Sequence, residues 1–235
     1  MKAIILAAGR GSRNNDLTDD LPKCLLKIGN KSLRERQNES LTQAGIHDIY
    51  IVGGYKINSL FAYNRPLYRN EKWESTNMVH SLLCAYETLK NFDCIVSYGD
   101  IFYSDKIVSL LSKSKEMISV AYDKNWLSLW KKRFENVLDD AESFKKDVME
   151  NIIEIGKQAN TIDEIEGQYM GLLKFKKEFW VSHKDFLDSI PANSSMTDFL
   201  QTLIQRGVGI KGVENIWPWG EADSPEDIEV YESNV

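Results

Sequence analysis

The loop at residues 9–13 combines glycine and arginine in a pattern that suits a bound anion. It reads Gly-Arg-Gly-Ser-Arg and directly follows a short apolar run. Glycine lets backbone amides approach an anion closely, and the Arg13 guanidinium can neutralise charge on it. Asn14 stands where a dinucleotide-binding fingerprint has its third glycine, and Lys31-Ser32 lacks the glycine spacing of a Walker loop. The sequence therefore predicts an anion-binding loop of another type, although a tight turn has the same pattern.

Asp100 is placed to bind a divalent cation, because it stands just past an apolar run. Carboxylate oxygens, shared with phosphates, are the ligands that Mg²⁺ prefers. Asp223 lies in an acidic segment near the C-terminus, where it can cap a helix that begins at Pro225, unless Ser224 takes that place. Glu221 is expected to lie outside the ligand set or at the surface.

A longer pattern extends the glycine loop. Leu-Ala-Ala-Gly-x-Gly-x-Arg at residues 6–13 is followed by Thr-x-x-x-Pro-Lys at residues 18–23. Together they resemble the signature of the nucleotidyltransferases that activate sugar phosphates and phosphocholine. The resemblance implies that the loop wraps a nucleoside triphosphate and that Arg13 and Lys23 are catalytic. Lys23 can alternatively be an ordinary solvated lysine with no functional role. Residues 15–18 lack the proline that is common in the family's loop.

The resemblance also implies contacts with the base and the metal. Gly53 and Tyr55 correspond to a loop beside the base. Thr76 and Asn77 match a segment near the base and ribose, although either can simply cap the next helix. Asp223 falls in a match to the family's acid-x-Asp-x-Pro-Glu-Asp segment, which makes it the second metal carboxylate. The residues implied to bind the nucleotide are Leu6, Ala8, Gly9, Gly11, Ser12, Arg13, Lys23, Gly53, Tyr55, Thr76 and Asn77.

Aromatic and charged residues in the middle of the chain suit an acceptor site. Trp126 and Trp130 are four residues apart and share a helix face, with Arg133 one turn further. Core packing explains such a pair. The functional alternative is an aromatic wall with a cation, which can hold the acceptor's phosphate or a quaternary ammonium group. Glu142 and Glu166 can instead meet an amine.

This middle stretch resembles one branch of the family, the phosphocholine cytidylyltransferase-like and phosphoglutamine cytidylyltransferase proteins. The resemblance implies a magnesium-dependent transfer from CTP to a small phosphorylated or phosphonate acceptor, for the decoration of cell-surface polysaccharides. A sugar-1-phosphate transferase that uses UTP, GTP or dTTP and a non-catalytic nucleotide sensor stay open as alternatives. Residues 196–198 can approach the acceptor, but the C-terminal third is too weakly patterned to identify it.

The elements that position these residues alternate between strand and helix. Strands are predicted at residues 2–7, 49–52 and 94–98, and helices at residues 32–44 and 77–89. This alternation predicts an α/β fold, with a Rossmann-like, mainly parallel sheet flanked by helices. Ligands then lie at the carboxyl ends of the strands.

The second half is expected to complete the same domain, which spans residues 1–235. Residues 123–167 are predicted to form an inserted acceptor-binding lobe over the site. The remaining strands are expected at residues 117–123, 152–155, 168–175 and 208–213. Two helices are expected from Glu178 onward, one of them containing residues 196–205.

Composition limits the class of protein. The 235 residues carry a formal net charge of −6, which weighs against a nucleic-acid partner, and no apolar stretch is long enough to span a membrane. Three widely spaced cysteines indicate reduced thiols in a cytoplasmic protein. A homodimer stays open, because the sequence does not fix the oligomeric state.

Overall fold

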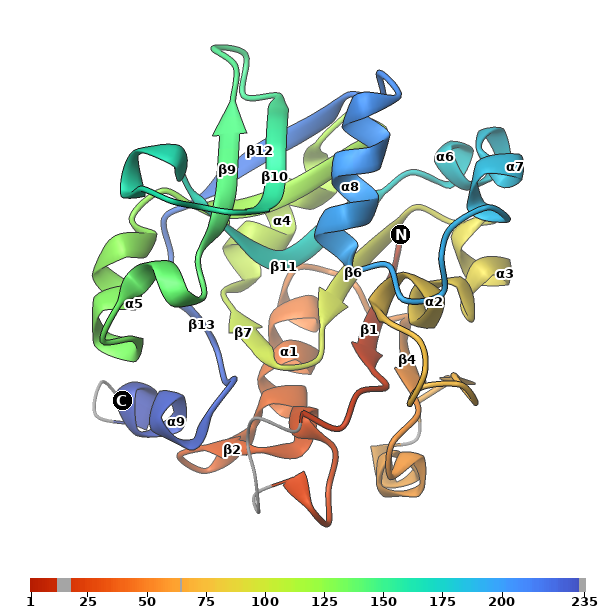
Figure 1. Cartoon of the computed structure of the whole chain (residues 1–235). Coiled ribbons are helices and arrows are strands. Elements are labelled where there is room, and N and C mark those ends of the chain that lie inside the picture. Colours follow the sequence, from red (N-terminus) through yellow and green to blue (C-terminus); the bar gives the residue numbers. More distant parts are fainter. Residues whose placement is uncertain (12–17, 64, 233–235) are drawn as a thin grey trace.

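A seven-stranded sheet forms the centre of the molecule (Figure 1). The computed structural model describes residues 1–11, 18–63 and 65–232. The strand order is β12-β8-β11-β6-β1-β4-β5, and β11 runs antiparallel to both of its neighbours while all other pairs are parallel. The strands are β1 (Lys2–Ala7), β4 (Ile49–Gly53), β5 (Leu67–Arg69), β6 (Cys94–Tyr98), β8 (Ile118–Asp123), β11 (Gln168–Phe175) and β12 (Ile210–Asn215). The predicted mainly parallel α/β sheet is confirmed.

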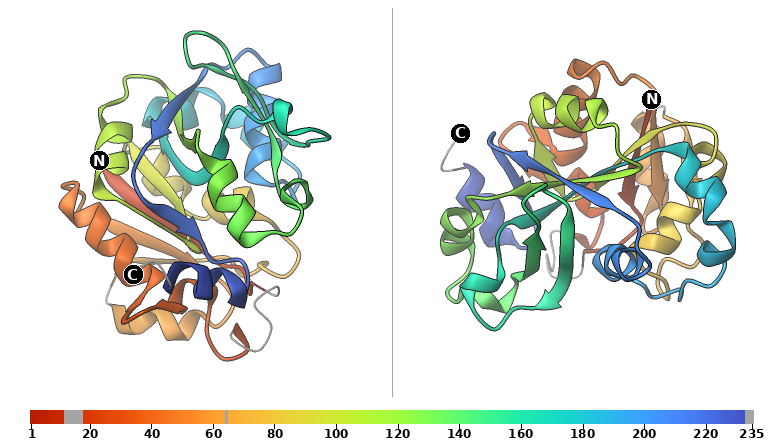
Figure 2. Two further views of the ribbon diagram at one scale, coloured as in Figure 1. Left: turned by 90° about the vertical axis from the view of Figure 1, so that its left-hand side faces the viewer. Right: turned by 90° about the horizontal axis from the view of Figure 1, so that it is seen from above.

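Helices cover both faces of the sheet (Figure 2). One face carries α2 (Met78–Leu83), α3 (Tyr86–Leu89), α6 (Lys177–Ser182), α7 (Lys184–Leu187) and α8 (Met196–Gln205). The other face carries α1 (Leu33–Gln43), α4 (Asp105–Lys113) and α5 (Trp126–Arg133). Strand β1 shows how the sheet separates two cores, because Ile4 and Leu6 pack on one face and Ile5 on the other.

Shorter elements complete the described chain. A third apolar cluster lies under α9 (Pro225–Glu232). Three two-stranded pairs are formed by β2 (Lys27–Ile28) with β3 (Lys31–Ser32), β7 (Ile101–Tyr103) with β13 (Trp219–Glu221), and β9 (Glu142–Lys146) with β10 (Ile152–Gln158). The 3₁₀ helices are η2 (Lys23–Leu25), η3 (Ile57–Tyr63), η4 (Val137–Asp139) and η5 (Ile162–Glu164). None of the described helices is both long and apolar enough to cross a membrane.

Several predicted elements have the expected bounds. Strands β1, β6 and β11 match the prediction residue for residue, and α8 is the helix predicted to contain residues 196–205. Helix α1 begins with the predicted serine cap, as Ser32 Oγ accepts the Glu35 N–H while the Glu35 carboxylate accepts the Ser32 N–H at 2.7 Å. Gly45 follows the helix with φ +86°, a conformation that favours glycine.

Other predictions need correction. The helix predicted at residues 77–89 is two helices, because Cys84 and Ala85 separate α2 from α3. Three helices, α6, α7 and α8, replace the two expected after Glu178. The last strand, predicted at residues 208–213, begins at Ile210 and ends at Asn215. The sequence pattern did not indicate β7, β9 or β13. Strands β7 and β13 have three residues each, too few to show a period of two, so their pairing with each other determines them.

Residues 123–167, predicted to form an inserted lobe, connect β8 to β11. They contain α5, the hairpin of β9 and β10, and two 3₁₀ helices. The hairpin lies beside α8 in Figure 1, and the Ile155 N–H donates to Gln201 Oε1 of α8 at 2.9 Å. This contact ties the inserted segment to the rest of the fold.

Candidate active site

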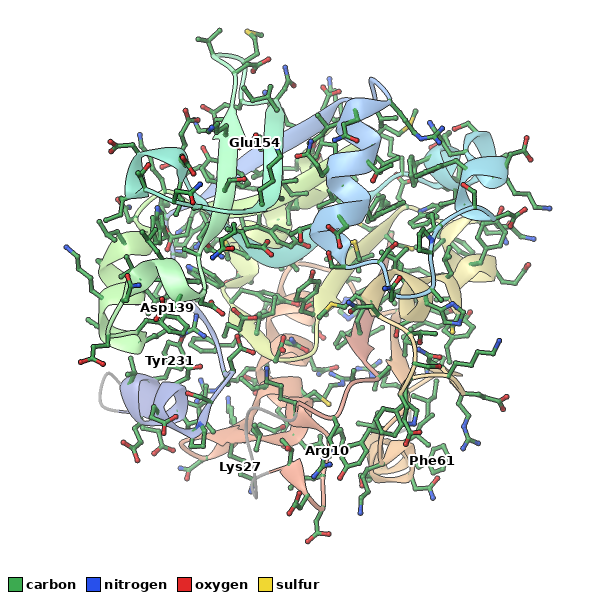
Figure 3. All side chains as sticks on the ribbon, viewed as in Figure 1. Arg10, Lys27, Phe61, Asp139, Glu154 and Tyr231 are labelled. Carbon is green, nitrogen blue, oxygen red and sulfur yellow. The ribbon has the colours of Figure 1, made fainter. Side chains whose placement is uncertain are left out.

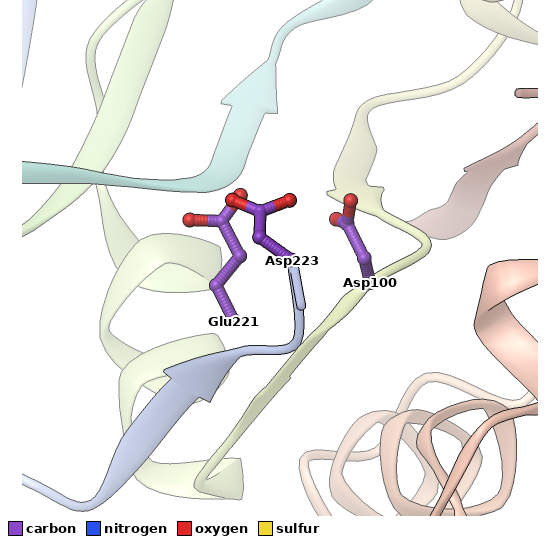
Figure 4. A group of neighbouring side chains, drawn as sticks. All are labelled: Asp100, Glu221 and Asp223. Atoms are coloured by element: carbon purple, nitrogen blue, oxygen red, sulfur yellow. The ribbon is translucent and has the colours of Figure 1, made fainter. Parts of the chain in front are cut away.

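Three carboxylates meet at the carboxyl end of β6 (Figure 4). Oxygens of Asp100, Glu221 and Asp223 all lie within 4.8 Å of one another. Asp100 directly precedes β7, which pairs antiparallel with β13, and the Ala222 N–H donates to the Asp100 carbonyl at 2.9 Å. This pairing brings together residues that are more than a hundred positions apart. Asp100 and Asp223 are therefore neighbours, as predicted, and Glu221 joins them.

The Lys23 ammonium lies between the two aspartates. Its Nζ donates to Asp100 Oδ2 at 2.8 Å and also to Asp223 Oδ1. Burial alone would lower the pKa of Lys23, but the Asp100 and Asp223 carboxylates outweigh burial and raise this pKa. Lys23 is 9% exposed, so it is not a solvated lysine. Its aliphatic chain packs on Gly11, whose φ of +71° turns the chain past it.

Repulsion among the carboxylates creates a place for additional positive charge. Burial, followed by the Asp223 and Asp100 carboxylates, raises the pKa of Glu221 well above its usual range. Asp100 Oδ1 is buried and has no hydrogen-bond partner among the described residues. Oxygen ligands from carboxylates suit a hard divalent cation. The donor set therefore fits such a cation.

Arg133 and Asp227 hold the turn that carries Asp223, one of the three clustered carboxylates. The Arg133 guanidinium donates to Asp227 through Nε at 2.7 Å and Nη2 at 3.0 Å. The other Asp227 contacts hold the turn, because Oδ2 accepts the backbone N–H groups of Asp223 at 2.8 Å and Ser224 at 3.0 Å. Ser224 caps α9, since its Oγ accepts the Asp227 N–H at 3.3 Å. The alternative in which Asp223 caps this helix is therefore wrong.

Two adjoining cavities extend from the cluster along the glycine loop. One, of about 270 Å³, is lined by Leu6, Ala7, Gly9, Gly11, Lys23, Cys24, Met78, Gly99 and Asp100. The other, of about 130 Å³, is lined by Leu6, Ala8, Gly9, Trp73, Thr76, Asn77, Met78 and Ser81. Most of the predicted nucleotide-binding residues line one of these two cavities. Ser12 and Arg13 lie outside the described residues.

The loop after the second strand packs against Ala8 and Trp73, two residues that line the smaller cavity. The Tyr55 N–H donates to the Ala8 carbonyl at 2.9 Å, and the Tyr55 ring lies edge-on to Trp73 with centroids 5.3 Å apart. Gly53 lines neither cavity, because it is buried against Ile57, whose Cγ1 would lie 2.8 Å from an added Cβ. Gly53 is therefore a packing residue, which corrects its predicted contact with the nucleotide, and Trp73 is a cavity residue that the sequence pattern did not indicate.

Thr76 and Asn77 have local structural partners as well. The Asn77 side chain caps α2 by accepting the Met78 N–H at 2.8 Å, as the alternative reading predicted. The Thr76 hydroxyl donates to the Lys72 carbonyl at 2.8 Å and accepts from Asn70 Nδ2 at 3.0 Å. Both side chains nonetheless line the smaller cavity.

A third cavity, of about 290 Å³, opens on the other side of the carboxylates. Its walls beyond the cluster are Asn77, Met78, Tyr98, Asp140, Glu142, Gln168, Tyr169, Met170, Gly171, Ser195, Met196 and Thr197. Burial raises the pKa of Glu142, Thr197 opposes this shift, and Asp140 and Asp198 add to it. Of residues 196–198, the first two line the cavity, whereas Asp198 completes the capping box of α8.

The prediction of an aromatic wall at the acceptor site is wrong. Trp126 and Trp130 are 3% and 0% exposed and pack in the core on the face of α1 and α4. Neither ring presents an open face to a ligand, so the core alternative holds. The side chain of Arg133 is fully buried against Asp227. Its guanidinium therefore stabilises the acidic turn and does not reach the third cavity.

Glu166 is the other predicted acceptor residue that the structure places elsewhere. It is exposed, and its carboxylate accepts the Lys146 N–H at 2.9 Å. Glu142 and Asp140, from the same inserted segment, line the third cavity instead. Asp140 stands two residues before Glu142, and this proximity was the available signal for it.

Comparison with known proteins agrees with this geometry. The MobA-like NTP transferase domain family matches residues 3–155. CTP:phosphoglutamine cytidylyltransferase of Campylobacter jejuni is 41% identical over 252 residues, which cover 98% of this chain and 98% of that protein. Choline-phosphate cytidylyltransferase of Streptococcus pneumoniae is 41% identical over 39% of this chain and 42% of that protein.

A solved structure supports the fold. The inositol-1-phosphate CTP transferase of T. maritima superimposes with a TM-score of 0.79 at 21% identity, over 98% of this chain and 93% of that one. The family match covers most of the chain, and the Campylobacter relative covers nearly all of it. The chain belongs to the nucleotidyltransferase family with the MobA-like NTP transferase domain, among its cytidylyltransferases.

Proposed function

We propose that this enzyme transfers a cytidylyl group from CTP to a small phosphorylated or phosphonate acceptor and releases pyrophosphate. The observation that carries the proposal is the position of Lys23, Asp100 and Asp223 where the two nucleotide-side cavities meet the third cavity. The full-length relative supports CTP as the donor, because it is a CTP:phosphoglutamine cytidylyltransferase. The donor occupies the glycine-loop side and the acceptor the side of the third cavity.

The reaction needs orientation more than proton transfer. An acceptor phosphate is ionised near neutral pH, so its oxygen can attack the α-phosphorus directly. The new phosphorus–oxygen bond forms as the bond from the α-phosphorus to the bridging oxygen breaks, and pyrophosphate leaves with that electron pair. Lys23 moves little to donate to the developing negative charge, since its ammonium already lies at the junction. Arg13 is proposed to act on the leaving phosphates.

Asp100 and Asp223 are proposed to hold Mg²⁺, with Glu221 as a further carboxylate at its edge. The ion would supply electrostatic stabilisation for the crowded phosphate oxygens. Three clustered carboxylates and the buried Asp100 Oδ1 support this choice. Arg133 and Asp227 position the turn that carries Asp223.

The acceptor is proposed to carry an amine. Among the described residues, the lining of the third cavity contains no lysine, arginine or histidine, whereas Asp140 and Glu142 add carboxylates away from the metal cluster. An acidic wall complements the positive charge of an ammonium group, a charge that the hydroxyl groups of a sugar lack. Residues 123–167, which supply these two carboxylates, are thus proposed as the acceptor-binding lobe of a single 1–235 domain.

The chemistry and the relatives support a proposal for the cellular setting. CTP-dependent activation of a small acceptor in the cytoplasm, for later transfer to a surface polysaccharide, is the proposed role. The three described cysteines are free thiols, which fits that compartment. The homodimer stays a prediction.

Pyrophosphate release with Mg²⁺ tests the proposal. We would cross CTP, UTP, GTP and dTTP with phosphoglutamine, phosphocholine, an aminoalkylphosphonate and glucose 1-phosphate. Release with CTP and an amine-bearing acceptor is expected. Release with only the hexose phosphate would overturn the acceptor assignment. Tight nucleotide binding with no release from any pair would instead favour the sensor.

Two substitutions test the site within that assay. Lys23→Ala and Asp223→Ala should each reduce turnover by about 10²–10³-fold, since each removes charge stabilisation at the junction. Lys31→Ala is a matched control, because Lys31 also holds a carboxylate, Glu39, but on the exposed surface. Near-normal turnover in Lys23→Ala would contradict the site assignment.

A further inference from the structure

The buried side chain of Gln37 connects α1 to the turn that carries Asp100. Its Nε2 donates to the Tyr98 carbonyl and to the Ile101 carbonyl, both at 2.7 Å, and lies 3.4 Å from Ser97 Oγ. The two carbonyls stand on either side of Gly99 and Asp100. Gln37 is fully buried, so water does not replace these contacts. One amide group thus spans the whole turn.

Other contacts also reach the turn, since the Ser97 hydroxyl donates to the Tyr98 carbonyl and the Ala222 N–H to the Asp100 carbonyl, both at 2.9 Å. The Gln37 side chain differs from these contacts because it bonds both ends of the turn at once. An added Cβ on Gly99 would lie 2.6 Å from the Leu6 carbonyl, so the backbone of the turn presses directly on β1. Buried carbonyls need a donor. An amide supplies two N–H donors with fixed directions, whereas a glutamate offers at most one donor and a methionine offers none. The residue type at position 37 is therefore matched to two facing carbonyls.

We propose that Gln37 is a positioning residue that sets the metal affinity of the site by fixing the Asp100 backbone. This inference rests on the proposed function, in which Asp100 is a ligand of the divalent cation. Asp100 meets Asp223 across a turn whose two ends Gln37 holds. Without the two donors the ends of the turn separate, and the carboxylate of Asp100 no longer faces that of Asp223 in the geometry that binds the ion.

Ser40 provides a matched control on the same helix. Its hydroxyl donates to the Tyr103 carbonyl at 2.6 Å, and the residue is buried. This bond also joins α1 to β7, but it contacts the strand three residues beyond Asp100. Ser40→Ala therefore removes a comparable hydrogen bond without freeing the turn.

The test measures Mn²⁺ binding by electron paramagnetic resonance in the presence of CTP, for the full-length chain and three variants. Gln37→Met should weaken Mn²⁺ binding at least tenfold and raise the Mg²⁺ concentration for half-maximal pyrophosphate release to a similar degree. Turnover at saturating Mg²⁺ should fall much less. Gln37→Glu keeps the side-chain volume and should show the same defect if Gln37→Met does not fold. Ser40→Ala should stay within twofold of the wild type.

The outcomes separate this inference from the proposed function. If the wild type bound no Mn²⁺ with CTP present, the metal site and the inference would both fail. If the wild type bound Mn²⁺ and both Gln37 variants bound it equally well, only the inference would be overturned. Equal weakening in the Gln37 variants and Ser40→Ala would also overturn it, since that result indicates a general loss of packing.

Discussion

Arg133 and Asp227 form a buried, two-point ion pair, with Nε–Oδ1 at 2.7 Å and Nη2–Oδ2 at 3.0 Å. The side chains are 0% and 3% exposed. The same Asp227 carboxylate accepts the backbone N–H of Asp223, so the pair joins helix α5 to the turn that carries Asp223. Burial alone would lower the pKa of Arg133, but the Asp227 bond outweighs it and raises this pKa.

Asp227→Asn should therefore damage both stability and activity. The change removes the charge nearest to the buried Arg133 guanidinium, leaves it with the more distant carboxylates of Glu221 at 3.7 Å and Asp223 at 3.6 Å, and weakens the bonds to the turn. Removing one partner of a buried pair costs about 3–5 kcal/mol, and this range is the expected fall in the free energy of unfolding. Urea unfolding measures it. Glu39→Gln, which breaks the exposed pair with Lys31, is the control and should change stability by about 0.5 kcal/mol or less. A similar loss in both variants would contradict the buried role.

Trp73→Ala should weaken nucleotide binding with little change in turnover. Trp73 lines the smaller cavity beside Ala8 and Thr76 and braces Tyr55. Stacking of a base on an aromatic side chain contributes about 1–3 kcal/mol, so the KM for CTP should rise roughly 5- to 150-fold. Initial-rate kinetics at saturating acceptor measure it.

The control for Trp73→Ala is the removal of an exposed aromatic ring elsewhere on the surface. Phe61 is 64% exposed and lines none of the cavities described above (Figure 3). Phe61→Ala should leave the KM for CTP within twofold of the wild type. A KM in Trp73→Ala that matched this control would place the base elsewhere.

Motif spacing predicted which residues share the site better than it predicted which way they face. The place of Asp100 after an apolar strand, and the resemblance of the segments around Lys23 and Asp223 to the family, assigned the three residues to one site. The pairing of β7 with β13 is what brings the two aspartates together. The spacing of Trp126 and Trp130 correctly indicated a shared helix face. A spacing cannot state whether that face meets a ligand or the core, because both environments select aromatic residues.

Glu221 and Arg133 depend on contacts that no local pattern contains. Glu221 reaches the cluster because β13 pairs with β7, and the two strands are more than a hundred residues apart in the chain. Arg133 is one turn beyond Trp130, yet its partner Asp227 lies 94 residues away. Pairing between distant parts of the chain determines where both side chains lie, so local propensity and periodicity could not predict their positions.

Glu142→Gln should make the folded protein more stable and weaken acceptor binding. Burial raises the pKa of Glu142, so the fold disfavours its ionised form. The free energy of unfolding is therefore lowered at any pH above about 4.3, the pKa of a glutamate in the unfolded chain, and glutamine removes this loss. The variant should melt at a higher temperature than the wild type at pH 7, and the difference should vanish near pH 3.5, where both side chains are neutral.

The same variant should bind the amine-bearing acceptor less well. Loss of a charge-assisted bond to an ammonium group costs about 1.5–3 kcal/mol, which raises the KM for the acceptor roughly 10- to 150-fold. The KM for CTP should stay unchanged. Glu166→Gln is the matched control, because Glu166 belongs to the same inserted segment but is exposed and outside the cavity. An equal acceptor KM in both variants would refute the role of Glu142.

Gly11→Ala tests whether the glycine loop positions Lys23. Gly11 has φ +71°, and an added Cβ would lie 2.8 Å from Lys23 Cδ, so the lysine must shift. Gly207 has a similar φ of +79° but nothing within 4 Å of an added Cβ. A left-handed alanine costs about 1–2 kcal/mol, and both substitutions should lower stability by this amount. Only Gly11→Ala should also reduce kcat, by about tenfold or more, because displacement of the ammonium by an ångström weakens its hold on the reacting phosphates. Thermal unfolding and pyrophosphate release on both variants measure the two effects separately. A parallel loss of kcat in Gly207→Ala would mean that general destabilisation, and not the position of Lys23, explains the defect.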